Sequence, residues 1–447
     1  MHPITKPLLL SLATYSLATP LWADNITDLQ AELLKMRQEY EQRITQLENR
    51  LAAAEQQQEK VLSPVISQGK KQSSTEFNPA ISLVLNGQIS DYENNPEDYS
   101  IHGFAIPGEG GLASEGGSLG ESELIISANI DQNLYGQATL ALHEEDGSTE
   151  VEMEEAYIET IGLNNGLTIR AGRYFAPISY LNEKHIHAWN FSDAPLIYRG
   201  LFGNQLSTDG IKLSYLLPIE QYTEVGASLG NGTRNPSAGG HNGIGDWLVY
   251  AKTGGDFDLA HSWQFGGAYW QSTPQGRNVG AAHAHAGETT ANPVQFTGKT
   301  QISNLSFVYK WTPEGYSRPQ FTLLSEYFYL KDDGQLSHDA ELADYSGRQY
   351  GGFTEGLYRL SPTWQTGVRY DYLGSRLTAS DTELLDDAGL DFTNYSPKRY
   401  GLMLEWLPSE FSRIRAQVNH DKASRQSDTQ FILQYTVSLG AHGAHSY

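Results

Sequence analysis

A strict alternation of apolar and polar residues marks the last strand-like segment of the sequence. Between residues 430 and 440, the odd positions from Phe431 to Leu439 are apolar, and the even positions are Gln, Thr, Ser or Gly except for Ile432. One apolar and one polar face with a period of two indicate a β-strand, and the length suits a tilted crossing of a bilayer. A strand of a soluble β-sandwich could alternate in the same way, so this segment alone leaves both folds open.

The same alternation recurs through most of the chain. Tyr400, Leu402 and Leu404, for example, alternate with the charged Arg399 and Glu405. Repetition of this pattern predicts about sixteen strands of roughly ten residues each. The predicted strands are residues 80–90, 119–131, 133–143, 151–162, 167–175, 207–217, 221–230, 244–254, 261–271, 300–311, 319–331, 348–359, 363–373, 398–407, 411–421 and 428–440.

Every second connection between these strands is short, and the others are mostly long and polar. Barrels of the bacterial outer membrane show this asymmetry, with tight periplasmic turns and long external loops. We therefore predict an all-β fold, a transmembrane antiparallel β-barrel of about 16 strands over residues 80–447. The predicted long connections are residues 91–118, 176–206, 231–243, 272–299, 332–347 and 374–397.

Composition agrees with a barrel that encloses water. The chain of 447 residues is only 39% apolar, yet it holds 44 Gly, 26 Tyr and 8 Trp. An aqueous lumen, a thin apolar outer band and aromatic girdles need that mixture. The absence of cysteine excludes disulfides and thiolate sites. A net charge of −23 argues against nucleic acid as a partner, because nucleic-acid-binding proteins carry a basic footprint.

The N-terminal residues carry a targeting pattern. Residues 1–23 combine the positive charge of Lys6 with a short apolar core between Leu8 and Leu17, and this combination predicts a signal peptide. A buried N-terminal helix is the alternative.

A heptad-like seam follows the signal peptide. In residues 24–61, apolar residues recur at three- and four-residue steps from Ile26 to Ala54, and this pattern predicts a helix that self-associates as a periplasmic coiled coil. A helix packed on the barrel is the alternative. Residues 62–79 are rich in Ser, Gln, Gly and Lys and predict a flexible linker.

This layout resembles Gram-negative outer-membrane porins. It is similar to the sucrose-specific porin, in which a periplasmic coiled coil precedes a trimeric barrel, and to the siderophore-porin family of the legiobactin receptor. The closing residues 434–445, QYTVSLGAHGAH, resemble the C-terminus of proteobacterial barrels labelled TonB-dependent or zinc-regulated receptors. A TonB-dependent receptor needs a plugged barrel of about 22 strands, which a chain of 447 residues cannot supply.

The resemblance implies a function, a partner set and a location. We expect a homotrimeric porin-type channel in the outer membrane, in contact with its lipid, for passive uptake of small hydrophilic solutes. The alternative is an outer-membrane receptor or porin for metal ions or metal chelates, such as zinc or a siderophore. We expect no cofactor, and scattered Ser, His and Asp residues without a triad context predict no enzyme.

Charged residues fall on the face that would line the lumen. Arg170, Arg369, Arg399, Arg413 and Arg415 could form a basic strip opposite an acidic set of Glu123, Asp131, Glu155, Glu159 and Glu326. A transverse field between the two sets would orient solutes, or the charges could merely pair. The loop 176–206 is the third connection on the long-loop side, after 91–118 and 144–150, and the porin resemblance implies that it folds inward; an ordinary external loop is the alternative. The candidate pore-lining or constriction residues are Arg170, Glu183, Lys184, Asp193, Arg199, Arg369, Arg399, Arg415, Glu155 and Glu159.

Closely spaced histidines are the candidate metal ligands. Imidazole pairs can chelate zinc or copper, although a site needs three or four converging ligands. Because they lie in a Gly- and Ala-rich loop, His283 and His285 are the predicted capture site. The pairs are His185/His187, His283/His285 and His442/His445.

Overall fold

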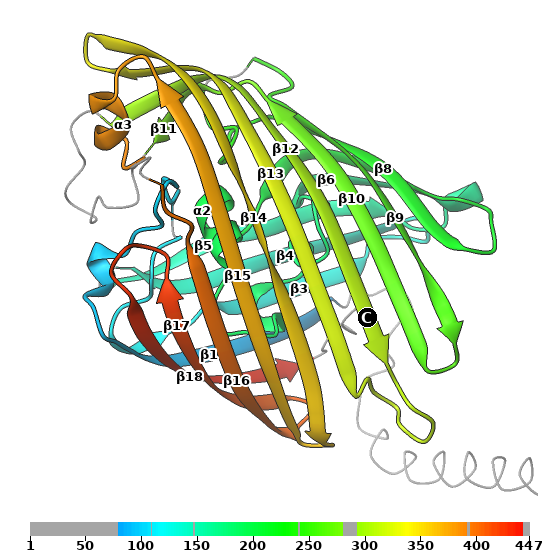
Figure 1. Ribbon diagram of the computed structural model, residues 1–447. Helices are drawn as coiled ribbons and strands as arrows, with labels where there is room; N and C mark the ends of the chain where they lie inside the picture. The colour runs from blue at the N-terminus through cyan, green and yellow to red at the C-terminus, as the bar shows by residue number, and fades with distance from the viewer. Residues whose placement is uncertain are drawn as a thin grey trace, which may run out of the picture. The chain divides into compact units, whose positions relative to one another are not determined.

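A computed structural model shows a single antiparallel sheet that closes into a barrel (Figure 1). The structure describes residues 79–108, 110–145, 148–239, 242–279, 293–390 and 394–440. The predicted signal peptide and coiled coil, the linker up to residue 78, and His283, His285 and Tyr447 lie outside these ranges and stay predictions.

The strands follow one another around the barrel in chain order. They are β1 (Ala80–Tyr92), β2 (Gly116–Leu119), β3 (Ser122–Asn129), β4 (Leu134–Glu145), β5 (Ser148–Thr160), β6 (Leu167–Phe175), β7 (Ser207–Leu216), β8 (Tyr222–Gly230), β9 (Asp246–Asp258), β10 (His261–Ser272), β11 (Gln275–Val279), β12 (Val294–Trp311), β13 (Phe321–His338), β14 (Glu341–Ser361), β15 (Trp364–Ala379), β16 (Lys398–Ser409), β17 (Ser412–Lys422) and β18 (Asp428–Gly440). The helices are η1 (Pro96–Asp98), η2 (Asn164–Gly166), η3 (Ile186–Ala188), α2 (Leu196–Phe202) and α3 (Glu383–Asp387).

Two of the eighteen strands are short continuations of their neighbours. Both β2 and β3 pair with β1, and both β10 and β11 pair with β12. The eighteen strands therefore form sixteen wall strands, 18 minus 2, and the predicted all-β barrel with that strand count is confirmed.

The barrel closes between its first and last strands. The pairing runs from Ser82 opposite Gly440 to Tyr92 opposite Gln430. No sheet edge is left open at this seam, which is what lipid requires, because a backbone group in hydrocarbon has no water to bond.

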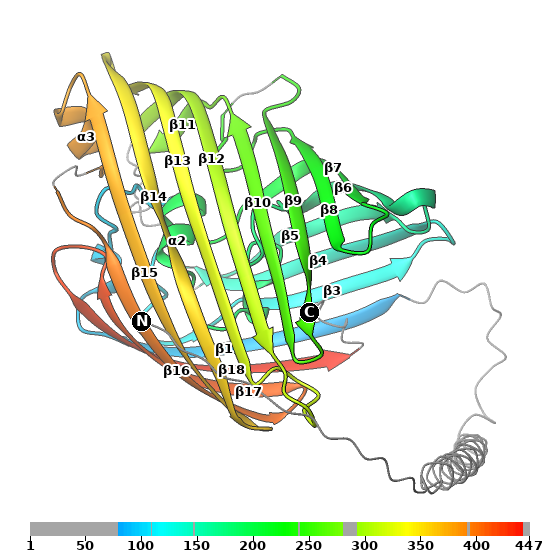
Figure 2. The same cartoon turned by 45° about the vertical axis from the view of Figure 1, so that its right-hand side comes forward.

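Four strands extend well beyond their predicted ends: β12 begins at Val294 and β15 ends at Ala379, and β13 and β14 extend toward each other. The predicted long connection 332–347 is wrong, because β13 continues to His338 and β14 begins at Glu341. Backbone pairing continues through this polar stretch, for example between Asp333 and Ser346. The tall side of the barrel in Figures 1 and 2 consists of these strands.

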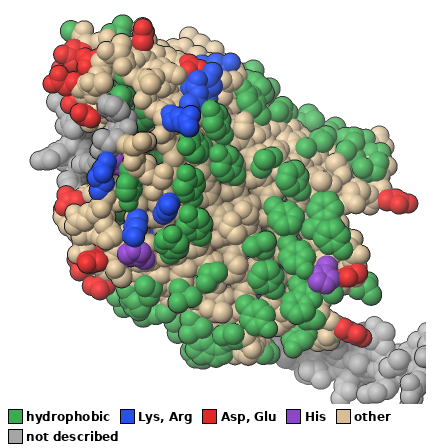
Figure 3. All heavy atoms as spheres, in the orientation of Figure 1, with side chains coloured by type: hydrophobic (Ala, Val, Ile, Leu, Met, Phe, Trp, Pro, Cys, Tyr) green, Lys and Arg blue, Asp and Glu red, His purple; other side chains and the backbone are tan. Residues whose placement is uncertain are grey.

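The exposure of wall residues is inverted relative to a water-soluble protein. On β18, Phe431, Leu433 and Tyr435 are 44%, 37% and 51% exposed, whereas Gln430 and Gln434 are buried. Figure 3 shows apolar side chains spread over the outside of the strands. Soluble proteins rarely expose a continuous apolar surface of this extent. The outer face is therefore suited to lipid and the inner face to polar contents.

Aromatic residues mark the edges of this apolar band on β13 and β14. Phe321 lies opposite Tyr358, and Tyr329 lies opposite Tyr350 eight residues further along β13. Eight residues span about 26 Å of strand, which is comparable with the apolar band of about 25 Å in outer-membrane barrels. The rings of Tyr329 and Tyr350 stack with centroids 6.4 Å apart.

Charged pairs begin immediately beyond the tyrosine edge. Asp333 pairs with Lys331 at 2.6 Å and with Arg348 at 3.1 Å on the outer face. At the opposite edge Trp364 and Trp406 stack with ring centroids 6.2 Å apart. Such interfacial aromatics are typical of a membrane boundary. None of the described helices is both long and apolar enough to be a membrane span.

Candidate channel constriction

The connection between β6 and β7, residues 176–206, folds into the barrel, and we call it loop L3. Figures 1 and 2 both show its helix α2 inside the ring of strands. Every residue of α2 is buried. The long connection that the sequence singled out is therefore an internal obstruction and not an external flap.

Helix α2 docks on an apolar patch of the inner wall. It begins after Pro195 and ends at Gly203, whose φ of 70° suits a residue without a Cβ. Tyr198 and Phe202 meet the ring of Phe328 on β13 edge to face, at centroid distances of 5.4 and 5.6 Å. Leu324, Phe328 and Leu330 are all apolar and buried on the inner face of β13, and apolar residues on an inner face were the available signal for a loop-docking patch.

Asp193 fixes the middle of L3 to three neighbouring strands. Its Oδ1 lies 2.5 Å from Nη2 of Arg369 on β15, and its Oδ2 lies 2.8 Å from Nη1 of Arg399 on β16. The side-chain amides of Gln417 and Asn419 on β17 donate to the same carboxylate at 2.6 and 3.0 Å. Burial would raise the pKa of Asp193, but the two guanidinium groups hold that pKa below its usual value. Asp193 is therefore ionised at neutral pH.

Further carboxylates extend the ionic network beneath L3, among them Asp371 and Glu405. Asp371 lies 3.2 Å from Nε of Arg369 and accepts the first backbone N–H of α2 at 2.8 Å. Arg415 pairs with Glu405 at 2.6 Å and donates to the backbone oxygen of Trp189 at 2.9 Å. The network thus binds L3 through both side chains and backbone.

The connection between β1 and β2, residues 93–115, packs against α2. Nη1 of Arg199 on α2 donates to the backbone oxygen of Gly110 at 3.0 Å. Phe104 is buried at the same contact. Arg199 therefore joins two connections inside the barrel.

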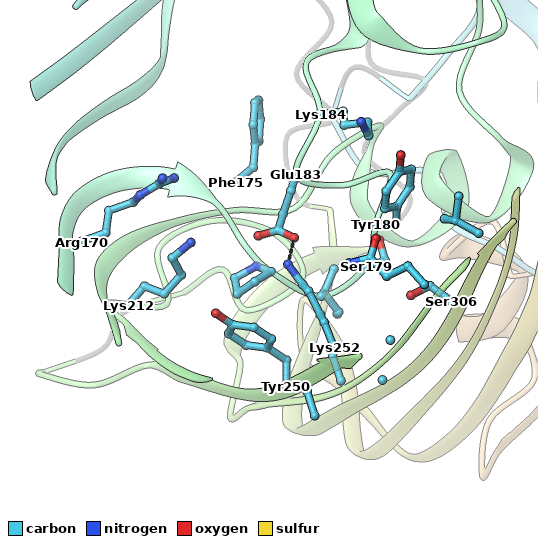
Figure 4. Close-up of a pocket in the computed structure, with 18 of the residues that line it drawn as sticks. Arg170, Phe175, Ser179, Tyr180, Glu183, Lys184, Lys212, Tyr250, Lys252 and Ser306 are labelled. Atoms are coloured by element: carbon cyan, nitrogen blue, oxygen red, sulfur yellow. Dashed lines mark hydrogen bonds and ion pairs between the residues drawn. The ribbon is translucent and has the colours of Figure 1, made fainter. Parts of the chain in front are cut away.

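A cavity of about 310 Å³ remains between L3 and the wall formed by β5 to β10 and β12 (Figure 4). Figure 4 shows Arg170 and Lys212 reaching from β6 and β7 toward the carboxylate of Glu183, which is paired with Lys252. Four basic side chains outnumber two acidic ones in its lining. They are Arg170, Lys184, Lys212 and Lys252, against Glu155 and Glu183.

Two histidines join the first half of L3 to glutamates of β3 and β5. Nδ1 of His185 lies 3.0 Å from Glu123 Oε2, and its Nε2 lies 3.1 Å from Glu155 Oε2. Nδ1 of His187 lies 2.5 Å from Glu123 Oε1. Burial disfavours the charged imidazole, but the Glu123 carboxylate and hydrogen bonds to neighbouring glutamates reverse this effect and raise the pKa of His185 well above its usual value.

The predicted site residues fall into three groups. The group buried beneath L3 consists of Asp193, Arg369, Arg399 and Arg415. The group that lines the cavity consists of Arg170, Glu155, Glu183 and Lys184. The third group makes single contacts: Glu159 pairs with Arg170, and Arg199 holds the β1–β2 connection. L3 therefore covers the buried arginines of the inferred basic strip. Neighbouring carboxylates pair with these arginines.

The sequence analysis did not single out four residues of the site. Asp371 and Asn419 contact L3 or its anchor, and Lys212 and Lys252 line the cavity. Lys212 was visible on the polar face of its strand, but nothing in the sequence distinguished it from other lumen-facing cations.

No family model matches the sequence. An uncharacterized protein of Aquifex aeolicus (strain VF5) is 27% identical over 406 residues, which cover 84% of this chain and 81% of that protein.

Several solved outer-membrane proteins have a similar shape. A loop-L8 deletion mutant of OmpT from Vibrio cholerae has a TM-score of 0.49 at 11% identity, covering 81% of this chain and 99% of that chain. The outer membrane channel DcaP of Acinetobacter baumannii has a TM-score of 0.49 at 10% identity, covering 82% and 99%. An anion-selective porin from Comamonas acidovorans has a TM-score of 0.46 at 10% identity, covering 81% and 100%. The barrel fold of this chain rests on its own strand pairing and not on these likenesses.

Proposed function

We propose that this protein is a porin-type channel through which small hydrophilic solutes cross the outer membrane passively. The observation that carries the proposal is a closed barrel with inverted burial. On β16, Leu402 and Leu404 are 56% and 43% exposed on the outside, whereas Arg399 and Glu405 are buried inside. An apolar exterior suits lipid, and closure leaves no unpaired strand edge within it.

Loop L3 supports a constriction that selects solutes. It occupies the side of the lumen next to β13–β18, where the Asp193 network holds it, and leaves the cavity on the side of β6–β10. A solute that passes L3 on that side meets Arg170, Lys212 and Lys252. Rings of charge set the selectivity of a pore, so the excess of basic side chains favours anions over cations of equal size.

A homotrimer with a periplasmic helix remains part of the proposal. Its support is the heptad-like seam between Ile26 and Ala54. Three copies of such a seam could pack together below three barrels.

Solute uptake by liposomes tests the proposed function. Purified protein is reconstituted into vesicles, and swelling is followed in glucose, gluconate and N-methylglucamine, three solutes of similar size and different charge. We expect swelling with glucose, faster entry of gluconate and slower entry of N-methylglucamine. Vesicles that hold correctly folded protein but do not swell in any of these solutes would contradict the channel, and equal rates for the two ions would contradict its anion preference.

A further inference from the structure

Five acidic and imidazole side chains converge where the first half of L3 meets β3 and β5. Glu123 comes from β3, Glu154 and Glu155 come from β5, and His185 and His187 come from L3. Glu123 is fully buried and His187 is 7% exposed. The cluster is therefore a built feature of the interior and not a chance meeting of surface side chains.

The donor atoms of this cluster lie at or inside the spacing of a metal coordination sphere, the shortest separation being 2.5 Å between His187 Nδ1 and Glu123 Oε1. A tetrahedral zinc ion with bonds of about 2.0–2.1 Å holds its ligand atoms about 3.3 Å apart. Nδ1 of His185 lies 3.0 Å from Glu123 Oε2 and 3.3 Å from Glu154 Oε2. Ligand atoms of Glu123, His185 and His187 all lie within 4.8 Å of one another.

The second nitrogen of His185 has the partner that a metal-bound histidine normally has. A ligating imidazole usually donates its other N–H to a carboxylate, which fixes the tautomer and the ring orientation. Nε2 of His185 lies 3.1 Å from Glu155 Oε2. The ring of Phe175 packs edge-on against the same imidazole at a centroid distance of 5.2 Å. Nδ1 of His185 is thereby aimed at Glu123 and Glu154.

The negative charge around the cluster also favours a divalent cation. Glu121 places a carboxylate oxygen within 4.8 Å of those of Glu123 and Glu154. Carboxylates brought this close together repel one another unless they share a proton or a cation lies between them.

We propose that Glu123, His185 and His187 bind a zinc ion, with Glu154 as a further carboxylate beside His185 and Glu155 orienting His185. Imidazole nitrogen and carboxylate oxygen are both zinc ligands. The side chains of His185 and Glu154 are 17% and 10% exposed, so the site is nearly closed. The zinc ion therefore has a structural role. It joins L3 to β3 and β5, whereas the Asp193 network joins L3 to β15, β16 and β17.

Calorimetry with zinc chloride on the full-length protein in detergent, stripped beforehand with EDTA, tests this proposal. Because His283 and His285 lie outside the described residues and could also bind metal, a His283→Ala/His285→Ala variant serves as the matched background. We expect one zinc ion to bind per chain in the natural protein and in this background. In the background, Glu123→Gln and His187→Gln should abolish measurable binding, and Glu155→Gln should weaken it by roughly 10–100-fold.

Folding and ligand geometry are read out separately. Heat-modifiable migration in gels confirms that each variant retains a barrel, and cobalt(II) replaces zinc as a spectroscopic probe whose visible absorption bands report tetrahedral coordination. Folded natural protein without zinc binding would overturn the proposal. Binding that survives both Glu123→Gln and His187→Gln, or that disappears only on loss of His283 and His285, would also overturn it. None of these readouts depends on solute transport.

Discussion

Arg369 on β15 and Asp193 on loop L3 are 176 positions apart in the chain, and their Nη2 and Oδ1 atoms lie 2.5 Å apart in a buried contact. Arg399 on the next strand shares the same carboxylate. Asp193 and Asp371 thus share two buried guanidinium groups of the wall, and the position of L3 depends on the charge of Asp193.

Asp193→Asn should release L3 from the wall. The substitution leaves Arg369 and Arg399 with less buried counter-charge, and breaking a buried pair in this way costs about 3–5 kcal/mol. We expect larger and noisier single-channel conductance with the barrel intact. Asp333→Asn is the matched control, because Asp333 pairs with Lys331 and Arg348 on the outer face, away from L3. If Asp193→Asn and Asp333→Asn give the same conductance as the natural protein, Asp193 does not hold the loop.

The same contact predicts how conductance depends on acidity. Because the pKa of Asp193 in the folded protein is lowered from 3.8, its stabilisation of L3 is fully present above about pH 4 and is lost as the pH falls through the lowered value. Between pH 7 and about pH 4, Asp193 stays ionised, so its titration should not alter the conductance. The conductance should rise only in stronger acid. The Asp193→Asn channel should lack that acid-dependent rise; a rise of equal size in both channels would assign it to another group.

Lys212→Gln combined with Lys252→Gln should reduce the preference for anions. Both lysines line the cavity, and removal of two of its four basic side chains leaves the charges of the lining balanced. The reversal potential in a potassium chloride gradient measures the change. Lys331→Gln removes a cation from the outer face and should leave the potential as it is. An unchanged potential in the double variant would show that solutes do not pass along this side of L3.

Leu402→Arg tests whether the outer surface faces lipid. Leu402 is 56% exposed, within the outward apolar row of β16. An arginine near the middle of a bilayer should lower the free energy of unfolding by about 2–4 kcal/mol, whereas in a water-soluble barrel the change would be close to neutral. Denaturant unfolding in lipid vesicles measures it. Gln335→Arg, also outward but beyond the charged residues of β13, should have little effect.

The sequence was sufficient to predict the wall strands wherever contact with lipid imposes an alternation of apolar and polar residues. Tyr400 and Arg399 could be assigned to opposite faces because apolar-out and polar-in alternate within one strand, which is local information. The ends of β13 and β14 could not be found, since beyond Tyr329 the outer face turns polar, although inward residues such as Leu336 and Ala343 remain apolar and buried. There the strands are held by backbone pairing, as between Asp333 and Ser346, and such pairing leaves no periodicity in side-chain type.

The interior of the barrel was less predictable, because its contacts are long-range. Arg369 could be placed on the lumen face from the sequence. Its burial, however, is due to L3, and the path of L3 depends on contacts with strands that come after L3 in the chain. His185 and His187 were recognisable in the sequence as a spaced pair. Glu123 lies on β3, several strands before L3, and no feature of the sequence predicted its contact with the two histidines.

Single-channel recording in planar lipid bilayers tests the channel most directly. Purified protein added to one side of the bilayer should insert and give discrete, uniform conductance steps, with a reversal potential in a potassium chloride gradient that indicates preferred passage of chloride. Folded, heat-modifiable protein that inserts into lipid and gives no conductance steps would contradict the account, because L3 would then close the barrel completely.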